Sequence, residues 1–131
     1  MGVSSLRELG QLDLEAATSK LDDLTYRRVR HIITENDRVL ATVAALRAGR
    51  IEKIGPIFEA SHVSMRDDFE ISIPELDLAV ETALKTGAIA SRMTGGGFGG
   101  AAIAVIDKDL LPSLAMAVKA AFIRAGFGPA N

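Results

Sequence analysis

Apolar residues recur every three or four positions over much of the chain, which is the period of an amphipathic α-helix. The clearest such segment covers residues 26–46, where Thr25 is placed to cap the start and Gly49 follows the end. Its apolar positions are Val29, Ile32, Ile33, Val39, Leu40, Val43 and Leu46. A short helix and a turn are expected before it, over residues 3–24. The first third of the chain is therefore predicted to be helical.

The helical pattern continues over residues 51–65, but Pro56 lies inside this segment. Because proline has no N–H and its ring clashes with the preceding turn, Pro56 should either open a new helix or kink this one. A further helix is predicted over residues 76–84, and Gly87 is placed to end it. The sequence Ser72-Ile73-Pro74-Glu75 has the form of a capping box, with Ser72 accepting from the Glu75 N–H.

The pattern changes after this helix, because residues 88–94 and 101–106 are predicted to be strands. The glycine-rich turn, residues 95–100, separates them and makes a hairpin. The expected fold class is α+β, helix-rich, with a small antiparallel sheet that carries this hairpin. Because two strands make a thin sheet, a further strand is expected either in the N-terminal segment or past residue 131.

A last helix is predicted from about residue 110 to residue 124, with Asp109 as its cap and Gly126 at its end. Its apolar side carries Leu114 and Phe122.

The composition is that of an ordinary globular domain, with 48% hydrophobic and 24% charged residues over 131 positions. One domain covering residues 1–131 is expected. The net charge of −2 argues against a partner that is a nucleic acid or a membrane surface. The absence of cysteine excludes disulfides and thiolate metal sites, and it is compatible with a cytoplasmic protein. Two histidines are too few for the usual metal-ligand groups, so no metal site is predicted.

The glycine-rich turn is the strongest candidate for chemistry, since it holds five of the 12 glycines. Glycines permit positive φ angles, and successive N–H groups in such a turn can form a concave site for a phosphate. A plain connection between two strands is the simpler interpretation, because turns alone explain many glycine-rich runs. A dinucleotide fingerprint is excluded, because a strand follows the glycines and no acidic residue occurs after Asp109. A Walker A loop is excluded because no Lys-Ser or Lys-Thr follows.

Three segments together resemble the C-terminal half of the galactokinase family, in the GHMP small-molecule kinase superfamily. They are Arg30–Asn36, Ser61–Asp77 and Arg92–Gly100, and their order and spacing also fit. The resemblance covers nearly the whole chain, although Ala101 replaces a frequent cysteine and Pro56 is unexpected. It implies an enzyme that transfers the γ-phosphoryl group of ATP, with Mg²⁺, to the anomeric hydroxyl of galactose.

The resemblance also implies a two-domain protein whose active site lies between the domains. The family's sugar-binding motif, Ser-rich phosphate loop and catalytic aspartate have no match here. The missing N-terminal domain is therefore expected as a partner in the same polypeptide, and the isolated chain is expected to be inactive and to self-associate. No residue of this chain is expected to be catalytic.

For site residues, the resemblance implies that the glycine-rich turn lies behind the phosphates. Its implied cofactor-binding residues are Gly95, Gly96, Gly97, Gly99 and Gly100. Gly96 and Gly97 are expected to hold positive φ angles or to let the backbone approach the phosphate loop. The residues expected to brace the domain junction are Ser61, His62, Arg66 and Asp67. A free-standing binding module of the same fold, and a kinase for N-acetylgalactosamine or arabinose, remain alternatives.

Overall fold

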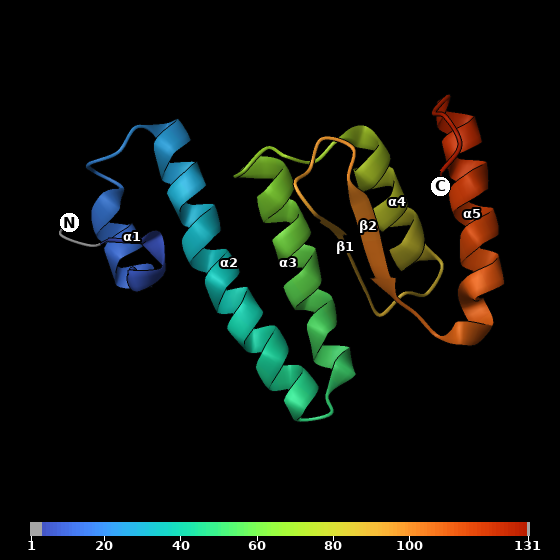
Figure 1. The fold of residues 1–131 in the computed structure, drawn as a ribbon, viewed down its shortest axis with the longest axis horizontal. Helices are drawn as coiled ribbons and strands as arrows, with labels where there is room; N and C mark the ends of the chain where they lie inside the picture. The colour runs from blue at the N-terminus through green and yellow to red at the C-terminus, as the bar shows by residue number, and fades with distance from the viewer. Residues whose placement is uncertain (1–3, 131) are drawn as a thin grey trace.

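The computed structural model describes residues 4–130 and shows helices flanking a two-stranded hairpin (Figure 1). The helices are α1 (Gln11–Ala17), α2 (Asp23–Arg47), α3 (Ile54–Asp67), α4 (Pro74–Lys85) and α5 (Leu111–Ala125). Single 3₁₀ turns cover Leu6–Glu8, Ile51–Lys53 and Lys108–Leu110. Strands β1 (Ala90–Thr94) and β2 (Ala101–Val105) pair antiparallel, with Ala90 opposite Val105 and Thr94 opposite Ala101. The predicted helix-rich α+β class is confirmed.

The hairpin lies between two groups of helices. Helices α2 and α3 run antiparallel on one side, with α3 against β1, while α4 contacts both strands and α5 packs on α4 (Figure 1). The core cluster joins Met65 of α3, Leu76 of α4 and Met93 of β1, and the partly buried Ile71, Ile73 and Ala102 pack around it. Burying these side chains is the main driving force that holds the hairpin between the helices.

Helix boundaries were predicted to within a few residues, but the predicted caps at three helix starts were wrong. Asp22, not Thr25, caps α2, because the Asp22 carboxylate accepts from the Thr25 N–H at 3.0 Å. Asp107, not Asp109, caps the 3₁₀ turn before α5 by accepting from the Asp109 N–H. In both cases the cap is the aspartate that comes first in the sequence, because its carboxylate reaches the free N–H groups of the first turn.

The predicted capping box before α4 does not form either. Ile73 occupies the cap position without a side-chain bond, and the Ser72 hydroxyl donates to the Asp77 carboxylate at 2.6 Å instead. Pro56 lies in the first turn of α3, so the prediction that it opens a new helix is confirmed. The glycines predicted to end helices do so, as Gly126 ends α5 in the left-handed conformation.

The further strand is not in the N-terminal segment, because residues 4–22 hold a 3₁₀ turn and α1. The alternative position, past residue 131, lies outside the described residues. Within residues 4–130, β2 therefore has one neighbouring strand, and its outer edge is open. In this part of the chain no helix has the length and apolar character needed to cross a membrane.

Candidate functional site: the glycine-rich turn and its supports

The glycine-rich turn links the last residue of β1 to the first residue of β2. Its backbone is left-handed at Gly95, Gly97 and Gly99, with φ angles of +83°, +82° and +107°. Phe98 also has a positive φ, +53°, and its side chain is 74% exposed. Five of the six residues of the turn, all but Gly97, are exposed, so an anion can approach the turn from outside this chain.

The turn is fastened to the segment between α3 and α4. The Phe98 N–H donates to the Ile71 carbonyl at 2.9 Å. A Cβ placed on Gly97 would lie 2.5 Å from the Ile71 oxygen, so only glycine fits this contact. The expectation of a positive φ is confirmed for Gly97 and is wrong for Gly96, where a Cβ would also meet nothing within 4 Å.

A cluster of charged and polar side chains joins α2, α3 and β1. The Glu35 carboxylate accepts from Ser61 at 2.6 Å, from Arg92 at 2.9 Å and from Arg38 at 2.8 Å. Arg92 also donates to the Ser61 hydroxyl at 2.9 Å and lies over the Phe58 ring. Burial tends to raise the pKa of Glu35, but these hydrogen bonds and the arginine charges outweigh it and lower the pKa. Glu35 is therefore held ionised and fully paired.

His62 joins α3, α4 and β1 through its two ring nitrogens. Its Nδ1 accepts from the Met93 N–H at 3.1 Å, so Nε2 carries the proton and donates to Asp77 at 3.0 Å. Burial lowers the pKa of His62 below its ordinary value of 6.5, against the opposing charge of Asp77. The ring is a neutral structural bridge, and Arg66 and Arg92 add charges that disfavour its protonation.

Stability should fall on mild acidification because both histidines have lowered pKa values, caused chiefly by burial. The unfolded chain then binds more protons than the folded chain as pH drops below about 6.5, so the free energy of unfolding decreases. We expect the melting temperature to fall between about pH 7 and pH 5, before most carboxylates titrate. The variant His31→Gln/His62→Gln should be less stable but should lose this dependence. If the melting temperatures of the unmodified chain and of the double variant fell equally, the pH dependence would not come from the two histidines.

Of the four residues expected to brace the domain junction, Ser61 and His62 are buried and connect elements within this chain, and their role at the junction stays a prediction. Arg66 and Asp67 are exposed and pair with each other at 2.7 Å, so their predicted role stays a prediction. No local pattern predicts that Glu35, Ser61 and Arg92 meet, because up to 57 positions separate them. Each does lie in one of the three galactokinase-like segments.

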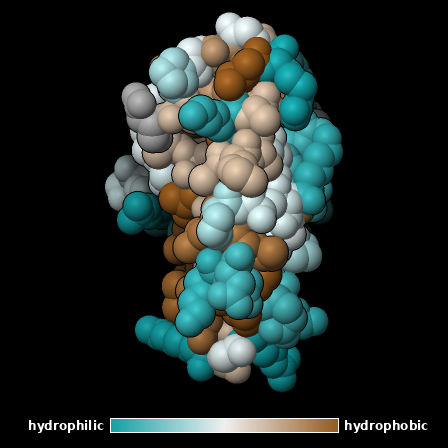
Figure 2. Space-filling view, turned by 90° about the vertical axis from the view of Figure 1, so that its right-hand side faces the viewer, coloured by the Kyte–Doolittle hydropathy of each residue, from teal (hydrophilic) through white to brown (hydrophobic). Residues whose placement is uncertain are grey.

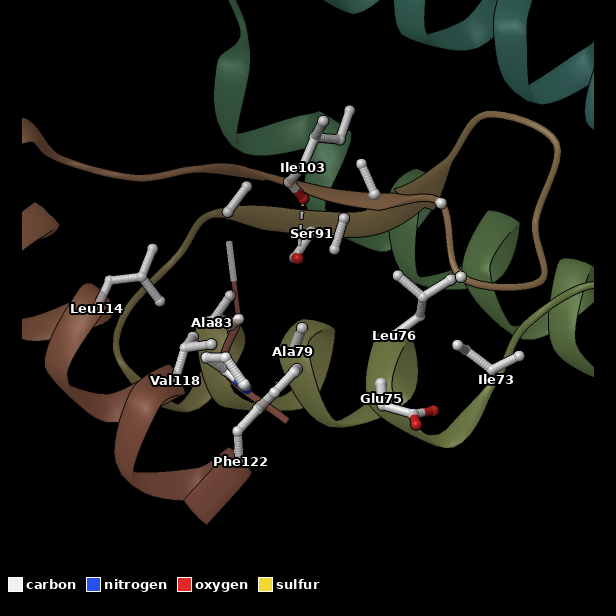
Figure 3. Close-up of a pocket in the computed structure, with 17 residues that line it drawn as sticks. Ile73, Glu75, Leu76, Ala79, Ala83, Ser91, Ile103, Leu114, Val118 and Phe122 are labelled. Carbon is white, nitrogen blue, oxygen red and sulfur yellow. Dashed lines mark hydrogen bonds between the residues drawn. The ribbon is translucent and has the colours of Figure 1, made fainter. Parts of the chain in front are cut away.

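A groove of about 490 Å³ lies beside the turn, between the hairpin, α4 and α5 (Figure 3). The helix side chains that line it are apolar except for one carboxylate: Glu75, Leu76, Ala79 and Ala83 of α4 and Leu114, Val118 and Phe122 of α5. The Ser91 hydroxyl above them already donates to the Ile103 carbonyl at 2.9 Å. The groove is therefore mainly apolar and suits packing better than polar chemistry. Nowhere in residues 4–130 do three or more His, Asp or Glu side chains group to hold a metal ion.

Comparison with known proteins assigns this chain, with its helices around a glycine-rich hairpin, to a family of kinases. The family model described as GHMP kinases C terminal matches residues 42–124, so the chain belongs to that family. Within it, the chain is similar to galactokinases. It is 47% identical over 128 residues to the galactokinase of Streptomyces coelicolor and 44% identical over 127 residues to that of Mycobacterium bovis. These matches cover 96% and 97% of the chain.

A solved structure agrees with the sequence comparison. The crystal structure of Lactococcus lactis galactokinase complexed with galactose matches all of this chain with a TM-score of 0.94 and 37% identity. The resemblance to galactokinases that the three segments indicated is confirmed. The chain spans only about a third of these relatives, 33% of the Streptomyces protein and 34% of the Lactococcus chain.

Proposed function

We propose that this chain is the C-terminal domain, residues 1–131, of an ATP-dependent galactokinase. The observation that carries the proposal is the 44–47% identity to galactokinases over nearly the whole chain. Galactose is bound in the similar Lactococcus protein, which supports a sugar as the phosphoryl acceptor. The product would be galactose 1-phosphate, and the use of ATP suits a cytoplasmic enzyme.

In the proposed enzyme the glycine-rich turn lies behind the phosphates of ATP. The turn fits this role because it is largely exposed and alternates left-handed glycines, an arrangement that lets backbone N–H groups face an anion. The residues we assign to it are Gly95, Gly96, Gly97, Gly99 and Gly100. ATP supplies the phosphoryl group when bound, and Mg²⁺ would be held by its phosphates and by groups outside this chain.

The rest of the proposed protein would cover the apolar surfaces that this chain leaves open. On α2, Val39, Leu40, Val43 and Leu46 are 40–61% exposed. On the α5 side, where Figure 2 shows hydrophobic residues gathered over the lower half, Leu111 and Met116 are 51% and 71% exposed. Exposed apolar patches of this kind usually mark an interface.

The isolated chain should therefore self-associate, since a second copy can cover the same surfaces. Light scattering should give a mass above 13.9 kDa that decreases on dilution. The double variant Leu40→Lys/Met116→Lys should reduce the association, whereas Glu81→Lys on the exposed face of α4 should not. A strictly monomeric chain would count against an apolar interface.

A chimera tests the proposed function directly. The 128 matching residues of the Streptomyces coelicolor galactokinase would be replaced with this chain, and ATP-dependent phosphorylation of galactose measured with a coupled assay. We expect activity from the chimera and none from this chain alone, because phosphoryl transfer requires groups that this chain does not supply.

The same assay with N-acetylgalactosamine and arabinose tests whether the chain alters the choice of sugar. The control is the Streptomyces protein truncated before the replaced segment, which should be inactive. A folded chimera without activity would contradict the proposal, and turnover by this chain alone would contradict the assignment of roles.

A further inference from the structure

Two neighbouring arginines of α2 hold the end of α3. Arg27 donates to the Asp67 carbonyl at 2.9 Å, and Arg28 donates to the Asp68 carbonyl. The last carbonyl groups of a helix have no partner within the helix and carry its partial negative charge. Cationic side chains that reach them fix both the direction of the last turn and the start of the following segment.

The same arginines bind Glu70, just beyond that helix end. Arg28 lies 2.6 Å from one Glu70 oxygen, and Arg27 lies 3.3 Å from the other. Glu70 has a φ angle of +57°, a left-handed conformation that few non-glycine residues adopt. The two ion pairs therefore hold a backbone conformation that the residue would not favour alone.

The left-handed residue sets the position of Ile71, which follows it. The Ile71 N–H returns to the Met65 carbonyl at 3.0 Å, and the Ile71 carbonyl accepts from the Phe98 N–H at 2.9 Å. The Ile71 backbone also lies against Gly97 so closely that a Cβ there would be 2.5 Å from its oxygen. An uninterrupted series of contacts thus runs from α2 through residues 68–71 to the glycine-rich turn.

We propose that Arg28 and Glu70 are positioning residues for ATP binding, acting through Ile71 on the glycine-rich turn. The proposal rests on the proposed function, in which the turn lies behind the phosphates. Neither residue touches the turn, and neither is assigned a catalytic role. Displacing a phosphate-binding backbone by about an ångström is enough to weaken binding and catalysis strongly.

The effect should be local because the Glu70 side chain is 48% exposed. Exposed ion pairs contribute little to the overall free energy of unfolding. The ion pairs of Glu70 and the hydrogen bonds from the two arginines to the carbonyl groups at the end of α3 instead select one conformation of residues 68–71. The glycine-rich turn, which is bonded to Ile71, is then held in one conformation as well. If Arg28 and Glu70 only stabilised the fold, replacing them would lower the free energy of unfolding of the whole chain. If they position the turn, replacing them loosens the turn while the core stays intact.

Amide hydrogen exchange in the isolated chain separates these two roles. The Phe98 N–H reports the turn, and the Met93 N–H, which donates to His62, reports the core. In Glu70→Gly, which keeps the positive φ but removes the carboxylate, we expect Phe98 to exchange at least about tenfold faster. Arg28→Gln should act alike and Arg28→Lys less strongly, with Met93 unchanged in all three.

The matched control is Glu81→Gln, which breaks the exposed Lys85–Glu81 pair of α4, 2.6 Å long, without touching the turn. Its Phe98 exchange should equal that of the unmodified chain. In the chimera, Glu70→Gly and Arg28→Gln should raise the KM for ATP about fivefold or more while the KM for galactose stays constant.

Unchanged Phe98 exchange in both variants would overturn the proposal, as would an equal acceleration at Met93. Faster exchange at Phe98 with an unchanged KM for ATP in an active chimera would overturn the link to ATP. If the chimera phosphorylates no galactose, the proposed function fails. The exchange measurement still decides independently whether Arg28 and Glu70 hold the turn.

Discussion

Gly97→Val is expected to lower the melting temperature of this chain by about 10 °C, corresponding to a loss of about 2–3 kcal/mol. The valine would have to adopt the left-handed φ of +82°, which a β-branched residue strongly disfavours. Its Cβ would lie 2.5 Å from the Ile71 oxygen, so the turn and residues 68–71 must separate. That movement also breaks the hydrogen bond from Phe98 to Ile71.

The matched control is Gly96→Val, one position earlier in the same turn. A Cβ on Gly96 meets nothing within 4 Å, and φ is not positive there. We expect its free energy of unfolding to stay within about 0.5 kcal/mol of the unmodified chain. In the chimera, however, Gly96→Val should weaken ATP binding if the phosphates lie against the turn. Equal melting temperatures for the two variants would contradict the close contact with Ile71.

The sequence predicted the hairpin and the order of the helices because both depend on local patterns. The period of apolar residues changes from helical to strand-like after Gly87, and the glycines mark the turn. The helix starts were less predictable, because two neighbouring residues can often serve as the cap. Asp22 and Thr25 form such a pair, since the carboxylate binds both the N–H and the hydroxyl of Thr25.

The candidate site was only partly predictable. The glycines could be identified from composition, but the neighbour that makes Gly97 necessary, Ile71, lies 26 positions earlier. The left-handed conformation of Glu70 could not be foreseen either, because glutamate has no preference for it. It depends on arginines of α2 that are 42 and 43 positions away. Such contacts are fixed by the packing of α2 on α3, which no local pattern encodes.

Glu35→Ala is expected to cause the second large loss of stability, because Glu35 lies where α2, α3 and β1 are joined. The carboxylate is the shared acceptor of Ser61, Arg38 and Arg92, and its side chain is 19% exposed. Removing it leaves two arginines close together without their common counter-charge. Breaking a fully buried pair costs about 3–5 kcal/mol, so this half-buried cluster should lose about 2–3 kcal/mol. Urea unfolding at pH 7 measures the loss.

Three comparisons separate the charge from the packing. Glu35→Gln keeps the shape and some hydrogen bonds, so it should lose about half as much as Glu35→Ala. Glu81→Ala removes an exposed partner of Lys85 and should cost less than about 0.5 kcal/mol. Because the pKa of Glu35 is lowered, its contribution should persist at neutral pH and disappear as pH falls below its ordinary value of 4.5. If Glu35→Ala costs no more than Glu81→Ala, the cluster does not stabilise the packing of α2 on α3 and of α3 on β1, and the apolar contacts between these elements suffice.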